Sequence, residues 1–160
     1  MIKMEIKGLL MDPVSNMPVV VLRDAANGVF LPIWVGIFEA NAIALQMEKI
    51  ATPRPMTHDL LRNAIEHLGA RVRQIVVCDL KESTFFALIH LDTPNGPVAI
   101  DARPSDAIAL ALRTKARILV EDTVLDHAKT IDFSAERPDT ERLQKWLESL
   151  DPDELGKYKM

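Results

Sequence analysis

Three strand-like segments that follow one another at the start of the chain constrain its fold more than any other feature. They cover residues 2–11, 18–24 and 29–35, and only the turn-forming stretches DPVSN and DAANG separate them. Strands this close in sequence pair antiparallel, because parallel neighbours need a crossover of about a dozen or more residues. We therefore predict a β-meander, with Pro32 marking an edge or a bulge because proline cannot donate a ladder hydrogen bond.

The later segments come in runs of strands and runs of helices rather than in strict alternation. Thr57 is a candidate N-cap for the second helix, and Gly69 is a candidate for its end. This order predicts an α+β fold, a largely antiparallel mixed sheet with buried helices packed on it, in a single compact domain. We expect that domain over residues 1–135, and a C-terminal helix with a loose tail over 136–160. The predicted strands are 71–82, 83–92, 97–102 and 116–121, and the predicted helices are 36–50, 58–68, 104–114 and 140–150, with a helical turn at 121–128.

The composition is that of an ordinary soluble globular protein and excludes several classes. Of the 160 residues, 48% are apolar and 26% are charged. No segment reaches the roughly 18 consecutive apolar residues of a membrane span, and the N-terminus lacks a signal-peptide pattern. The single cysteine, Cys78, excludes an intrachain disulfide framework and fits a reducing compartment. We therefore expect a cytoplasmic protein with no membrane partner.

The net charge of −4 argues against binding of nucleic acid through the overall field of the protein. Phosphate binding would need a local basic patch, and two candidates exist. They are Arg71 with Arg73, and Arg113 with Lys115 and Arg117. Alternate residues carry the charge in both, so they would share a face in an extended segment. Two solvated faces are the simpler interpretation.

Familiar motifs of catalytic sites are absent. The chain has no P-loop, G-x-G-x-x-G, H-E-x-x-H, paired C-x-x-C or G-x-S-x-G sequence. What remains is a set of acids, a histidine and two arginines close to predicted helix starts.

His58 and the acids near it have both structural and functional explanations. On the predicted helix His58 lies at the edge of an apolar stripe, where it suits either a structural role or acid–base and metal chemistry. Asp59 lines up with the solvent side, where it would interact with the helix N-terminus. Glu39, in the first turn of the first helix, has the same structural explanation, and a metal-binding or catalytic carboxylate is its functional one. The stripe consists of Leu60, Leu61, Ala64, Ile65 and Leu68.

The stretch DARPSDAIALAL at 101–112 places charge directly before an apolar helix. Pro104 suits the first helical position, and Ser105 and Asp106 can bond the free backbone N–H groups there. Asp101 and Arg103 precede the helix and lack such a role. Arg103 could pair with Asp101 or Asp106, or hold a phosphate near the helix N-terminus. A divalent metal between acids and phosphate would remove their mutual repulsion.

Three blocks, LPIWVGIFEANAIA (31–44), RPMTHDLL (54–61) and DARPSDAIALALR (101–113), strongly resemble the bifunctional nuclease family. The resemblance runs from about residue 1 to 135. It implies a compact α+β domain, often dimeric, with nuclease activity towards RNA and DNA. The positions that match the family's polar residues are Glu39, Arg54, Thr57, His58, Asp59, Asp101, Arg103, Ser105 and Asp106.

We therefore expect a nuclease that hydrolyses phosphodiester bonds of RNA and DNA. In this hypothesis His58 is the general acid or base, and Glu39, Asp101 and Asp106 complete the catalytic set and hold Mg²⁺ or Mn²⁺. The alternative is a non-catalytic oligomeric binding or regulatory module, whose polar blocks are helix caps and salt bridges. Either way we expect a homodimer or higher homo-oligomer. The expected phosphate ligands are Arg54, Arg103, Ser105 and Thr57.

Overall fold

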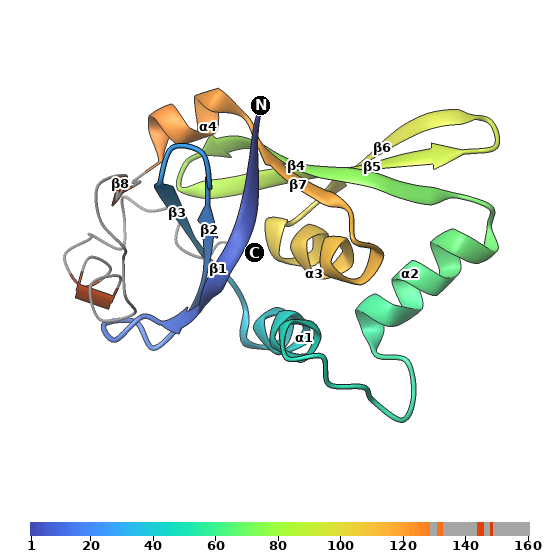
Figure 1. The fold of residues 1–160 in the computed structure, drawn as a ribbon, viewed down its shortest axis with the longest axis horizontal. Helices are drawn as coiled ribbons and strands as arrows, with labels where there is room; N and C mark the ends of the chain where they lie inside the picture. The colour runs from blue at the N-terminus through green and yellow to red at the C-terminus, as the bar shows by residue number, and fades with distance from the viewer. Residues whose placement is uncertain (129–130, 133–143, 146–147, 149–160) are drawn as a thin grey trace.

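The computed structural model describes residues 1–128, 131–132, 144–145 and 148, and its strands form one sheet (Figure 1). The order across the sheet is β6-β5-β4-β7-β1-β2-β3-β8. Only β4 and β7 pair parallel, and the other pairs are antiparallel. The strands are β1 (Ile2–Met11), β2 (Pro18–Arg23), β3 (Val29–Trp34), β4 (Arg71–Lys81), β5 (Thr84–Thr93), β6 (Gly96–Ala102), β7 (Arg117–Val120) and β8 (Ile131–Asp132).

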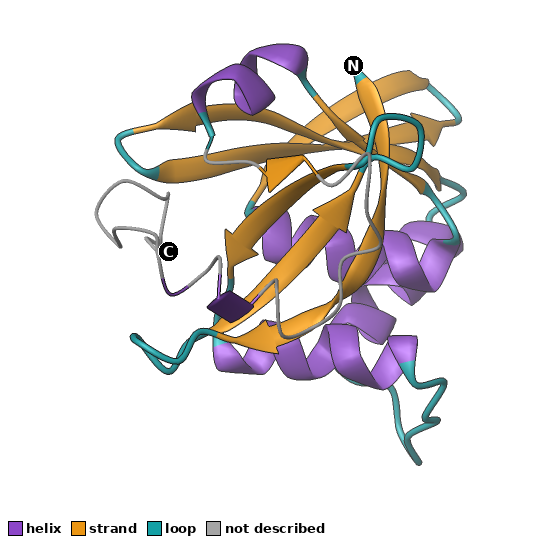
Figure 2. Cartoon of the chain, turned by 60° about the vertical axis from the view of Figure 1, so that its left-hand side comes forward, coloured by secondary structure: helices purple, strands orange, loops and turns teal. Residues whose placement is uncertain are grey.

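Three helices, α1 (Ile37–Met47), α2 (Thr57–His67) and α3 (Pro104–Thr114), lie on one side of the sheet, and α4 (Asp122–His127) lies on the other (Figures 1 and 2). This arrangement confirms the predicted α+β class with a largely antiparallel sheet. The predicted helix at 140–150 falls mostly outside the described residues. No helix in the described part of the chain is long and apolar enough to span a membrane.

Two buried aspartates hold the turns of the predicted meander. Asp12 accepts hydrogen bonds from the Val14 N–H at 3.0 Å and from the Trp34 indole N–H at 2.9 Å. Asp24 accepts one from the Ala26 N–H at 2.9 Å in the next turn. Such local bonds to the backbone are why Asp is favoured in turns. Pro32 pairs only with Val21 of β2, and no described strand pairs with its other side, so the proline lies at the predicted edge position.

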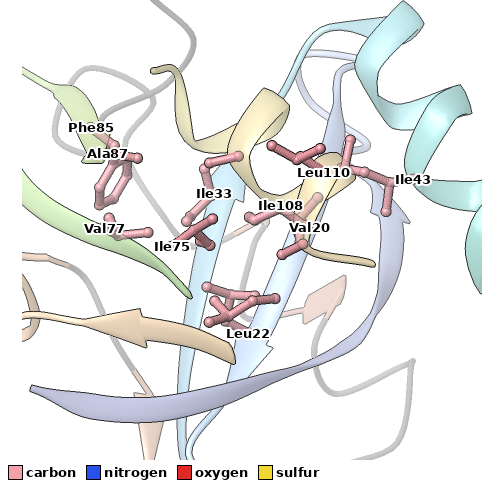
Figure 3. Packing of buried hydrophobic residues seen from close by; sticks show 14 of the residues in the cluster. Val20, Leu22, Ile33, Ile43, Ile75, Val77, Phe85, Ala87, Ile108 and Leu110 are labelled. Atoms are coloured by element: carbon pink, nitrogen blue, oxygen red, sulfur yellow. The ribbon is translucent and has the colours of Figure 1, made fainter. Parts of the chain in front are cut away.

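The main hydrophobic core lies between α3 and the sheet (Figure 3). Ile108 and Leu110 of α3 are fully buried, as are Val20 and Leu22 of β2 and Ile75 of β4. Residues 18–22 of β2 are all apolar, which is typical of a strand buried on both faces.

The helix α2 departs from the prediction in its first residue and in the faces it buries. Met56, rather than Thr57, is its N-cap residue, and the Asp59 carboxylate accepts a hydrogen bond from the Met56 N–H at 2.9 Å. The predicted apolar stripe is largely exposed, with 62% of Leu60 accessible, whereas His58 is buried. The predicted end is confirmed, since Gly69 has φ +79, a value that favours glycine.

Candidate functional site

The site forms where the first turns of three helices meet. Helix α3 packs against both α1 and α2. The first turns of α1, α2 and α3 carry Glu39, His58 and Asp106, respectively. Arg103 is the N-cap residue of α3, and Pro104 follows at the predicted first helical position. The three sequence blocks that resemble the nuclease family are far apart in the chain, and each contributes side chains to this one place.

Hydrogen bonds connect these four side chains in one chain. His58 Nε2 lies 2.8 Å from Asp106 Oδ1. Arg103 donates from Nε to Asp106 Oδ2 at 2.8 Å and from Nη2 to Glu39 Oε1 at 2.7 Å. The segments RPMTHD (54–59) and RPSD (103–106) thus meet through Asp106, and Arg103 pairs with Asp106 as one of the two partners that the sequence suggested.

The contacts set the protonation of Asp106. The hydrogen bond with His58 is the strongest influence and lowers the pKa of Asp106, and Arg103 lowers it further against the opposing effect of burial. Asp106 is therefore a carboxylate at neutral pH and acts as an acceptor towards both neighbours. For Arg103, burial opposes the charged form, but the two carboxylates prevail and raise its pKa.

A hollow of about 910 Å³ opens beside this cluster. Its polar lining includes Glu39, His58, Arg103 and Asp106, together with Asp101 from the end of β6. Most of the remaining lining is apolar. The apolar side chains include Phe38, Met56, Leu60, Leu61, Ala64 and Ile100.

The four expected phosphate ligands do not lie together in the structure. Arg103 and Thr57 line the hollow. Ser105 is buried and is not part of its lining, so the structure does not present its hydroxyl to a phosphate there. Arg54 lines a different hollow, on the other side of α2, with Asp59, Arg62 and Arg113.

The carboxylates do not form a ligand set for a divalent metal in this arrangement. The described residues contain no group of three or more His, Cys, Asp or Glu side chains placed to hold an ion. The Arg103 guanidinium bridges Glu39 and Asp106, and both Asp106 oxygens are already engaged. Glu39 Oε2 is buried without a hydrogen-bond partner in the described structure, but one free oxygen falls short of the six or so that Mg²⁺ or Ca²⁺ takes. Use of Mg²⁺ or Mn²⁺ stays a prediction.

Asp59 has a role that the sequence interpretation missed. Instead of facing solvent, it accepts a hydrogen bond at 2.7 Å from Nε of Arg113, whose side chain is only 2% exposed. Arg113 also donates to the backbone carbonyls of Ala109 and Ala42. This contact removes Arg113 from the basic surface patch predicted with Lys115 and Arg117. The signal in the sequence was an arginine that ends the apolar run AIALALR.

Comparison with known proteins gives the relationships of the chain. Residues 20–132 match the bifunctional nuclease domain. Uncharacterized proteins from two strains of Mycobacterium tuberculosis are 37% identical over 96% of this chain and 97% of their own length. Bifunctional nuclease 1 of Arabidopsis thaliana is 28% identical over 71% of this chain but only 36% of its own length. Bifunctional nuclease 1 of Oryza sativa subsp. indica is 24% identical over 69% of the chain. The chain therefore belongs to the bifunctional nuclease domain family.

Proposed function

We propose that the chain is a nuclease that hydrolyses phosphodiester bonds in RNA and DNA. The observation that carries this proposal is the pairing of His58 with Asp106 at the wall of the large hollow. A histidine oriented by a carboxylate is a common means of moving protons during hydrolysis. The names of the plant relatives support the same reaction.

In this proposal His58 is the general acid or base and Asp106 is a positioning residue. Asp106 holds Nε2, and no described residue donates to or accepts from Nδ1, so the second ring nitrogen is the one that serves the substrate. The negative charge of Asp106 also stabilises the imidazolium that forms when His58 takes up a proton.

Arg103 is the group proposed to contact the phosphate. Its side chain is 40% exposed although it is paired with two carboxylates. A guanidinium that two carboxylates hold in place can stabilise the negative charge that develops on a phosphoryl group in the transition state. Glu39, Asp101 and Asp106 outnumber the cations around the hollow, however, so affinity for a polyanion must come mainly from another surface.

Hydrolysis of a fluorescently labelled single-stranded RNA by purified variants tests the proposal. We expect His58→Gln to lower the rate by about 10²–10⁴-fold, the usual contribution of a general acid or base. His67→Gln is the matched control, because His67 lies on the same helix, is exposed and bonds only the Asn63 carbonyl among the described residues. Equal rates for His58→Gln and the parent protein would refute the catalytic role.

Two further arms complete this test. Addition of EDTA to the parent protein separates metal-dependent from metal-independent hydrolysis. Asp101→Ala tests the one carboxylate of the hollow for which no ion pair is seen within the described residues. Activity that survives unchanged in both His58→Gln and Asp101→Ala would point to a contaminant or to another site.

A second candidate function is a non-catalytic oligomeric binding or regulatory module. It is favoured by the exposed apolar side chains around the hollow, since Phe38 is 87% exposed and Leu60 and Leu61 are also accessible. Patches of this kind in a water-soluble domain mark interaction surfaces. Here Glu39, Arg103 and Asp106 would serve only to fix the helices, and a second copy would cover the apolar residues.

Light scattering after size exclusion distinguishes this candidate. A homo-oligomer that dissociates on Phe38→Asp and Leu60→Asp substitution, together with no hydrolysis by the parent protein, would favour the module over the nuclease. A monomeric parent protein would contradict the module.

A further inference from the structure

A third hollow, of about 300 Å³, lies at the C-terminal end of α2 and is strongly basic. Its lining includes one carboxylate, Glu66, and five cationic side chains. We call this the basic hollow. The cations are Arg62, Arg71, Arg73, Lys115 and Arg117.

The sheet brings these residues together from distant parts of the sequence. Strands β4 and β7 are parallel neighbours, with Gln74 opposite Arg117. The starts of both strands therefore lie side by side, and Arg71 and Arg73 come next to Lys115 and Arg117. The two basic segments noted in the sequence thus form one surface, with Arg62 of α2 taking the place of the buried Arg113.

Ion pairs compensate only part of this charge. Arg71 and Arg73 share Asp92, at 3.0 Å and 3.7 Å. Arg117 donates to the neutral amide of Gln74 at 3.0 Å. Within the described structure no carboxylate oxygen lies within 4.0 Å of a charged nitrogen of Arg62, Lys115 or Arg117. Ion pairs therefore account for Arg71 and Arg73. Arg62, Lys115 and Arg117 have no carboxylate within ion-pair distance in the described structure, although Arg62 is close enough to Asp59 to help lower its pKa.

This concentration of charge contrasts with the rest of the chain. The whole protein has 19 Lys and Arg against 23 Asp and Glu, and five of those 19 cations surround one hollow. The positive potential is therefore local, and it can attract a polyanion that the protein as a whole repels.

We propose that the basic hollow binds the phosphodiester backbone of single-stranded nucleic acid. Arginine forks suit phosphate oxygens, and four of the five cations are arginines. Ile65 lines both the basic hollow and the hollow at His58, so the two lie on adjoining sides of α2. A flexible single strand can bend over one helix to reach both, whereas a duplex, with a persistence length of about 150 base pairs, cannot.

The identity of this ligand rests on the proposed nuclease function, but binding and hydrolysis can be measured separately. The basic hollow supplies the cations that the hollow at His58 lacks. It would hold one part of a strand while another part lies near Arg103.

The test is fluorescence anisotropy of labelled oligouridylate RNA at several salt concentrations, with a labelled polyglutamate peptide as a second polyanion. The variant is Lys115→Gln with Arg117→Gln. The control, Lys3→Gln with Lys7→Gln, makes the same change in net charge at two exposed residues of β1 that do not line the hollow. Hydrolysis of the RNA is followed in the same samples.

We expect the parent protein to bind the RNA, and the slope of log K against log salt to fall by about 1.4 in the hollow variant. This value corresponds to two phosphate contacts at roughly 0.7 each for a single strand. The control should keep the parent slope, and polyglutamate should bind more weakly than RNA.

Several outcomes would overturn the inference. They are no RNA binding by the parent protein, equal slopes for the hollow and control variants, or polyglutamate binding as tight as that of RNA. If the parent protein hydrolyses RNA but the hollow variant binds RNA as tightly as the parent, the basic hollow is refuted as the binding site and the nuclease proposal is not. Binding through the hollow without hydrolysis would refute the nuclease proposal and leave the basic hollow in place.

Discussion

The buried ion pair between Asp59 and Arg113 gives the sharpest prediction about stability. Arg113 donates to Asp59 of α2, to Ala42 of α1 and to Ala109 of its own helix, so one guanidinium joins all three helices on this side of the sheet. Its side chain is 2% exposed and that of Asp59 is 20% exposed. Replacement of Asp59 by alanine would leave a buried positive charge without its counterion.

The size of the effect follows from that burial. Removal of one partner of a buried pair costs about 3–5 kcal/mol, and the partial exposure of Asp59 places Asp59→Ala near the lower end, at about 3 kcal/mol. For a chain of this length we expect a fall in Tm of roughly 6–12 °C, at about 2–4 °C for each kcal/mol. Urea unfolding monitored by circular dichroism measures the free energy.

A double-mutant cycle with Arg113→Met isolates the pair. Asp59→Ala also removes the carboxylate that accepts from the Met56 N–H, but this loss occurs in both backgrounds and cancels. We expect a coupling energy of about 2 kcal/mol or more. The exposed pair of Arg71 and Asp92 is the comparison, with an expected coupling below about 1 kcal/mol. A coupling for Asp59 and Arg113 no larger than that of the exposed pair would refute the reasoning.

The same pair makes a prediction about pH. Burial alone would raise the pKa of Asp59, but the hydrogen bonds from Met56 and Arg113 outweigh it and hold the pKa below its ordinary value. A carboxyl group with a lowered folded pKa contributes stability above its unfolded pKa and loses it as the pH falls through the folded value. The stability difference between the parent protein and Asp59→Ala should therefore be constant at neutral pH and narrow below about pH 4. A difference that widens in acid would contradict this sign.

Two further substitutions test local features by urea unfolding. Gly69→Ala should cost about 1 kcal/mol or more, because φ is +79 and the new Cβ would lie 3.3 Å from Pro94 Cγ. Gly8→Ala is the control, with no atom within 4 Å of its Cβ, and an equal cost for both would contradict the argument. Trp34→Phe should cost about 2 kcal/mol, since it removes a buried hydrogen bond of 2.9 Å to the Asp12 carboxylate. A loss below about 0.5 kcal/mol would show that this bond is dispensable.

The order and type of the secondary-structure elements could be predicted because local signals agreed with one another. The turn residues Asp12 and Asp24, the glycine at position 69 and the proline at position 104 all occupy the places that the sequence indicated. Each acts through its own backbone or its nearest neighbours. The parallel pairing of β4 with β7 has no such local signal, and it decides where the basic residues gather.

The contacts within the candidate site could not be predicted from the sequence, although the structure brings Glu39, His58, Arg103 and Asp106 together. Periodicity identifies the residues that share a face of a helix, but it does not say which face meets the rest of the protein. In α2 the polar side carrying Asp59 meets the buried Arg113, and the leucine side remains accessible. The burial of Ser105, which the sequence suggested as a phosphate ligand, could not be predicted for a similar reason. It follows Pro104 in the first turn of α3, on the side that packs into the protein.

Polar contacts hold α2 to α3 where apolar packing would be the usual means. His58 pairs with Asp106 and the adjacent Asp59 pairs with Arg113, so two successive residues of α2 fix the helix against α3. Because these polar contacts hold α2 against α3, Leu60 and Leu61 are not needed for that contact and line the hollow beside His58. A second copy seated on these leucines would border the entrance to the same hollow. If the chain both oligomerises through these leucines and hydrolyses RNA at His58, as the two proposals have it, the rate should fall as the protein concentration rises, so variants must be compared at one concentration.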